Sequence, residues 1–130
     1  AKLGTPPERP TIGEWRLDAP VHERKDLSIA TLRRQLAESR AILGGALGLY
    51  QIHSATIESG VFEDQPVLAE LARLAAEGLV IGLTVTGPKQ SDTIRRALDV
   101  RIVGVNPFRT VQATWNVLEP SAASALAEGK

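Results

Sequence analysis

The sequence predicts an α/β fold in which β-strands and α-helices alternate around a parallel sheet. From residue 28 onward, short apolar runs alternate with longer segments of helical periodicity, and glycine or proline stands at most of the boundaries. Strands that alternate with helices of about 10 to 15 residues form β/α units, whose strands pair in parallel. We therefore expect a single domain over residues 1–130, with a loop-rich leader at 1–27 and β/α units at 28–130.

The first 43 residues contain the leader and the first predicted helix. The leader is polar and rich in proline, which indicates loop with a short strand at residues 11–17. Residues 28–43 are predicted to form an amphipathic helix, because Ser28 can cap its first turn and the glycines at 44–45 can end its last. Its apolar side chains recur near helical spacing: Ile29, Leu32, Leu36 and Leu43.

Three later apolar runs are predicted to be strands, and a helix follows each of them. The runs contain many β-branched side chains, which favour strands. Pro66 suits the first turn of the second helix, and Gly78 suits its end. In chain order we expect a strand at 47–52, a helix from 66 to 78, a strand at 79–85, a helix at 91–98, a strand at 110–115 and a last helix opened by residues 119–121.

Each predicted strand has one polar or small face and one bulky apolar face. Side chains alternate between the two faces of a strand, so His53 shares a face with Leu49 and Gln51, whereas Tyr50 and Ile52 lie on the other. The later strands divide in the same way, with Gly82, Thr84, Thr86, Gln112, Thr114 and Asn116 opposite Ile81, Leu83, Val85, Val111, Ala113 and Trp115. A sheet covered by helices on one face and curved around a polar site on the other would produce this division.

Two architectures share the alternating pattern. In a doubly wound nucleotide-binding fold, the first strand leads directly into a glycine-rich turn that opens a helix. Here "GGALG" precedes a strand instead, and "TGPKQSD" lacks the spacing of a phosphate-binding loop. We interpret both as turns, with an anion contact as the alternative for the second. The barrel architecture is favoured, and because 130 residues are far fewer than the roughly 250 of a complete (β/α)8 barrel, we expect a half-barrel.

Composition excludes several classes of function. Lysine plus arginine and aspartate plus glutamate number 15 each, and the arginine pairs lack interleaved aromatic residues, so no nucleic-acid partner is expected. No long apolar run predicts a membrane span. The sequence has no cysteine, which excludes disulfides and thiolate metal sites and favours a cytoplasmic location. There is also no methionine, so we expect that translation starts upstream of Ala1.

Three segments together resemble the aldo-keto reductases. They are "LGLYQIHSATIESGVF", "LARLAAEGLVIGLTVTGP" and "TVQATWNVLEPSAASALAEG". The resemblance covers about residues 27–130, keeps the segments in the family's order and is tightest from residue 47 onward. It implies part of a (β/α)8 barrel, from about the third strand to the sixth helix. It also implies reduction of aldehydes or ketones with NADPH or NADH, so the expected partner is a small carbonyl compound.

The resemblance also assigns catalytic positions. The family places an aspartate, a tyrosine, a lysine and a histidine at the ends of successive early strands. His53 matches the histidine, and Lys2 in "AKLG" is the candidate for the lysine. In that chemistry the tyrosine protonates the carbonyl oxygen, the lysine lowers its pKa and the histidine orients the carbonyl. The aspartate and the tyrosine have no counterpart here, because Tyr50 is the only tyrosine and its place in the strand predicts a core position.

Cofactor contacts follow from the same resemblance. The family holds the nicotinamide carboxamide with a serine-asparagine pair after one strand and a glutamine on the next. Thr84 aligns with the serine and keeps its hydroxyl, and Gln112 matches the glutamine. Val85 replaces the asparagine and cannot form its hydrogen bond, so one of the family's contacts is missing.

Two alternatives concern other functions. Glu58, Glu63 and Asp64 could suggest a metal site, but carboxylates before a helix interact favourably with its amino terminus, so we expect no metal. A half-barrel would also expose two strand edges and an inner face, which favour pairing with another copy. The competing hypothesis is therefore a non-catalytic, self-associating structural unit.

Overall fold

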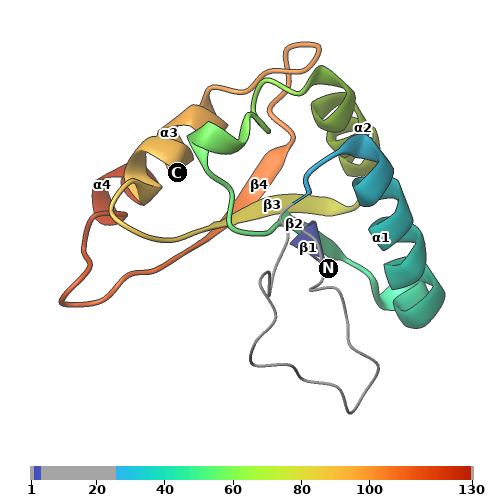
Figure 1. The fold of residues 1–130 in the computed structure, drawn as a ribbon, viewed down its shortest axis with the longest axis horizontal. Coiled ribbons are helices and arrows are strands. Elements are labelled where there is room, and N and C mark those ends of the chain that lie inside the picture. Colours follow the sequence, from blue (N-terminus) through green and yellow to red (C-terminus); the bar gives the residue numbers. More distant parts are fainter. Residues whose placement is uncertain (1, 4–25, 130) are drawn as a thin grey trace, which may run out of the picture.

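A computed structural model describes residues 2–3 and 26–129. They form an α/β fold in which helices pack on an open sheet (Figure 1). The strand expected at residues 11–17 lies outside the described residues. The elements in chain order are β1 (Lys2–Leu3), α1 (Ile29–Leu43), β2 (Leu49–Ile52), α2 (Gln65–Ala76), β3 (Val80–Val85), α3 (Gln90–Leu98), β4 (Phe108–Ala113) and α4 (Ala123–Glu128), with 3-10 turns at Gly44–Ala46 and Ile57–Ser59.

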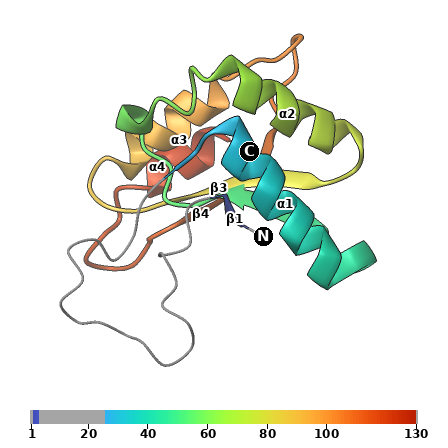
Figure 2. The same cartoon turned by 45° about the vertical axis from the view of Figure 1, so that its right-hand side comes forward.

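The four strands lie in the order β1-β2-β3-β4, and all neighbours pair in parallel. The helices pack along one face of the sheet in both views (Figures 1 and 2). The predicted order of β/α units is therefore confirmed. The described strands do not close into a barrel, and β1 and β4 form the two edges. None of the described helices is long and apolar enough to cross a membrane.

Local signals mark α1 and the start of α2 as expected, whereas the last helix begins at Ala123 and not at residues 119–121, because residues 116–119 form a hydrogen-bonded turn instead. The Ser28 side chain accepts a hydrogen bond from Thr31 N, and α1 ends at Gly44, whose φ of 52° favours glycine. Asp64 caps α2 through Val67 N. These caps satisfy backbone groups that a helix cannot pair by itself, so the boundaries of α1 and the start of α2 follow directly from the sequence.

The predicted division of faces is also confirmed for β2 and β3. Tyr50, Ile52 and Ile81 belong to the apolar core under the helices, whereas the residues of the opposite face do not, although Gln51 and Thr84 on that face are also buried. The buried cluster joins these strand residues to apolar residues of all four helices, among them Leu32, Leu36, Leu68, Leu71, Leu74, Ile94, Ala97 and Ala125. Each large aliphatic side chain buried in this way contributes about 1.5–3 kcal/mol, so this single core holds the helices on the sheet.

The predicted strand at 110–115 differs from β4, which begins at Phe108 and ends at Ala113. The reason is a side chain from α3. The Gln90 amide donates to Thr114 O at 2.9 Å, and Gln90 Oε1 accepts from Thr114 N at 3.2 Å. The Gln90 side chain thus pairs with both backbone groups of Thr114 that a neighbouring strand would otherwise pair with. The strand therefore ends before Thr114. Trp115 lies beyond the strand and is 67% exposed.

Gly82 lets β4 approach β3 closely. A β-carbon at this position would lie 2.8 Å from Thr110 O and would clash with the Thr110 hydroxyl. The pairing register shifts between Ile81 and Gly82, at the same place. No side chain fits here unless the backbone of β4 moves, so Gly82 determines how closely the two strands pack.

We expect Gly82→Ala to lower the free energy of unfolding by about 1–3 kcal/mol, because an added methyl group in a filled space forces the backbone to shift. Gly45→Ala is the matched control, since a β-carbon at Gly45 meets no atom within 4 Å and its φ is not positive. Urea unfolding of both variants measures the difference. Equal stability of the two variants would contradict the close approach at Gly82.

Candidate functional site

Three of the four predicted site residues lie in one row at the carboxyl end of the sheet. Ile52 pairs with Leu83 in the register, so His53, which follows β2, lies beside Thr84. Thr84 in turn pairs with Gln112. The backbone of Lys2 pairs with Gln51, two residues before His53. Side chains in one row of a parallel sheet point to the same face, so His53, Thr84 and Gln112 share the face opposite the helices.

Thr84 connects the loop after β2 to β3. Its Oγ1 accepts a hydrogen bond from Ser54 N at 2.8 Å and lies 3.4 Å from His53 Nδ1. Ser54 Oγ lies 3.3 Å from the other ring nitrogen, His53 Nε2. Thr84 is 7% exposed and His53 is half-buried. The imidazole ring is thus placed between two hydroxyl groups at the edge of the buried layer.

Ser54 adopts a backbone conformation that the sequence did not predict. Its φ is 49°, in the left-handed region that residues other than glycine seldom adopt and that costs about 1–3 kcal/mol. Two short hydrogen bonds hold the turn, from Ser54 N to Thr84 Oγ1 and from Ala55 N to Thr84 O, both 2.8 Å. The sequence carries no glycine here to signal the turn, so this feature appears only in the tertiary structure.

Gln112 is available for an external ligand. Its side chain is exposed and forms no hydrogen bond to any described residue. A primary amide can both donate and accept, so Gln112 fits the carboxamide of a nicotinamide. Thr84 fits less well, because its hydroxyl already serves Ser54 and His53, and Val85 is buried. Contact between Thr84 and a cofactor therefore stays a prediction.

Tyr50 lies in the core, as predicted, and away from the site. The side chain is fully buried, and its hydroxyl donates to Leu32 O of α1 at 3.4 Å. Burial, and secondarily the negative charge of Glu38, raises the pKa of Tyr50 to about 12. A phenol next to a lysine would have its pKa lowered instead. Tyr50 therefore does not act as the acid at the carboxyl edge.

The carboxylates after β2 have structural partners. Asp64 caps α2, and Glu63 pairs with Arg96 at 2.8 Å. Glu58 pairs with Lys89 at 2.8 Å, and this hydrogen bond holds the pKa of Glu58 below its ordinary value. The pair links the loop after β2 to the turn before α3. No group of three or more potential metal ligands occurs among the residues that the structure describes.

No protein-family model, curated protein or solved structure matches this chain. The resemblance to aldo-keto reductases therefore rests on the quoted segments and on the placement of His53, Thr84 and Gln112, and it stays a prediction.

The buried position of Tyr50 can be tested by absorbance titration, because no other tyrosine contributes to the signal. We expect no phenolate below about pH 10, the ordinary range of a tyrosine, and ionisation only near pH 12. Since the folded pKa is raised, the stability that Tyr50 contributes is complete below about pH 10 and is lost as the pH rises through about 12. Tyr50→Phe supplies the baseline. Phenolate below about pH 10 in the folded chain would contradict the assignment.

Proposed function

We propose that the carboxyl edge of the sheet binds a carbonyl compound and that the chain is an aldo-keto reductase-like, NAD(P)H-dependent oxidoreductase built as part of a (β/α)8 barrel. The observation that carries the proposal is the single row of His53, Thr84 and Gln112 on the face opposite the helices. The lack of cysteine goes with a cytoplasmic location.

Each residue of the row takes part in the proposed reaction. Thr84 Oγ1 holds the ring of His53 through Nδ1, and Nε2 exchanges its contact with Ser54 Oγ for a hydrogen bond that it donates to the carbonyl oxygen. The amide of Gln112 holds the carboxamide of the nicotinamide. The nicotinamide cofactor, when bound, supplies the hydride that reduces the carbonyl carbon.

The proton for the carbonyl oxygen needs a donor other than Tyr50, whose hydroxyl is buried against α1. Histidine is the commonest general acid in enzymes. The proposal therefore gives His53 this second task, so that hydride and proton together convert the carbonyl to an alcohol. In the family's pattern the lysine stands near this site. The backbone of Lys2 pairs with Gln51, two residues before His53, and this supports the same role for Lys2.

We expect the folded chain to consume NADPH only in the presence of an aldehyde, and we expect His53→Ala to abolish this turnover. His22→Ala is the matched control, because it removes the other histidine of the sequence. Absorbance of NADPH over time measures both. Turnover that persists in His53→Ala, or a folded wild-type chain that shows none with a panel of aldehydes and ketones, would contradict the proposal.

A second candidate is a non-catalytic unit that self-associates, and the open edges of the sheet favour it. Among the described strands, β1 and β4 each have a neighbour on one side only. Open strand edges pair readily with other strands, and two half-barrels joined at both edges would provide eight strands. A chain that remains at 13.9 kDa in solution at all concentrations would contradict this candidate.

A further inference from the structure

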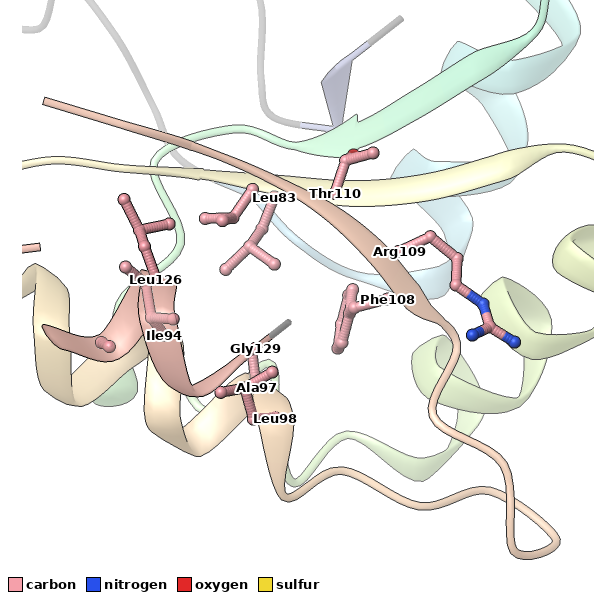
Figure 3. A pocket seen from close by; sticks show the side chains of 11 residues that line it. Leu83, Ile94, Ala97, Leu98, Phe108, Arg109, Thr110, Leu126 and Gly129 are labelled. Carbon is pink, nitrogen blue, oxygen red and sulfur yellow. The ribbon is translucent and has the colours of Figure 1, made fainter. Parts of the chain in front are cut away.

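A small apolar pocket lies between the sheet and the last two helices, beside the open edge of β4. Its volume is about 120 Å³. Ligand pockets usually measure about 300–1,000 Å³, whereas a cavity of about 150 Å³ accepts a single benzene ring. The pocket is thus sized for one apolar side chain. Figure 3 shows its lining, which includes Leu83, Ile94, Ala97, Leu98, Phe108 and Leu126.

An unpaired cation lies beside this pocket. Arg109 of β4 lines it and is exposed. Of the arginine and lysine side chains that the structure describes, it is the one that forms neither an ion pair nor a hydrogen bond. In Figure 3 its guanidinium group is directed away from the cavity. Arg109 can therefore meet a carboxylate that arrives next to the pocket from outside.

The loop between β4 and α4 presents an apolar tip of the required size. Val117 and Leu118 are 96% and 94% exposed, although both side chains are large and aliphatic. Asn116 holds the turn rigidly, because its Oδ1 accepts from Leu118 N at 2.9 Å and from Glu119 N at 3.0 Å. The carboxylate of Glu119 follows directly; its Oε1 accepts a hydrogen bond from Ser121 N at 3.1 Å, and Oε2 remains for an incoming cation. An exposed apolar tip next to an acid is typical of a binding element. Because this loop is already ordered, it loses little conformational entropy when it binds.

We propose that the tip at residues 117–119 of one copy docks in the pocket of a second copy. Leu118 fills the cavity, and Glu119 pairs with Arg109. The tip follows the carboxyl end of β4, whereas the pocket is lined by the first residues of β4, so each copy offers the tip at one end and the pocket at the other. The contact is therefore head to tail. It is independent of carbonyl chemistry, and it specifies a contact for the self-association of the second candidate.

Sedimentation velocity tests the contact with two variants at exposed positions. Leu118→Ser removes the tip. Gly129→Leu fills the pocket, because a β-carbon at Gly129 lies 3.3 Å from Leu98 Cδ2, and its φ of −87° accepts a side chain. Ile42→Ser is the matched control, since Ile42 is 83% exposed and belongs to α1, which lies on the opposite side of the fold from α3 and α4 (Figure 1).

We expect the wild type and Ile42→Ser to show the same rise in mass with concentration above 13.9 kDa. We expect each of the other two variants to weaken association by about tenfold or more, as the loss of a buried apolar anchor does. A mixture of Leu118→Ser and Gly129→Leu retains one intact tip and one intact pocket. We therefore expect it to form a heterodimer and nothing larger, which also shows that both variants are folded.

Three results would overturn this contact. A monomeric wild type would exclude it together with the second candidate, and would not affect the NADPH experiment. An oligomer that persists in both variants would place the interface elsewhere, such as the strand edges. A mixture that stays monomeric would show that the tip and the pocket do not meet.

Discussion

The hydrogen bonds that Thr84 accepts from the loop after β2 hold the candidate site together. The Thr84 hydroxyl accepts a hydrogen bond from Ser54 N, and the Thr84 carbonyl accepts one from Ala55 N. One residue of β3 therefore fixes the strained turn that follows His53. Without these acceptors, two backbone amides would lose their partners, and the left-handed turn at Ser54 would lose its support. The position of the imidazole ring in the same row as Gln112 thus depends on a contact between neighbouring strands.

The division of the sheet into two faces decides which side chains are available for chemistry. The helix-covered face takes Tyr50 into the core and raises its pKa, whereas the open face leaves His53 half-buried and Gln112 exposed. The face of the sheet on which a side chain lies therefore decides whether it can contact a ligand, whatever its chemical type. Within the described part of the chain, β4 also has an unpaired edge, with a pocket and an unpaired arginine beside it, so the proposed chemistry and the proposed assembly use different parts of one sheet.

The element order and the core could be predicted from the sequence because caps and apolar periodicity are local signals. Ser28, Asp64 and Gly44 fix helix ends by contacts a few residues away. The end of β4 could not be predicted, since Gln90, 24 residues before Thr114, replaces its strand partner. The turn at Ser54 depends on Thr84, 30 residues later, and the pocket depends on how α4 packs. Only the folded chain brings these groups together.

Amide hydrogen exchange at Ser54, compared between Thr84→Val and Thr84→Ser, shows whether Thr84 holds the turn that follows His53. Valine has nearly the shape of threonine but lacks the acceptor, whereas serine keeps it. We expect fast exchange of the Ser54 amide in the valine variant and wild-type protection in the serine variant. We also expect Thr84→Val to lower the free energy of unfolding by about 1–3 kcal/mol, because the Ser54 amide is left without an acceptor. Equal protection of Ser54 in both variants would show that Thr84 does not hold the loop that carries His53.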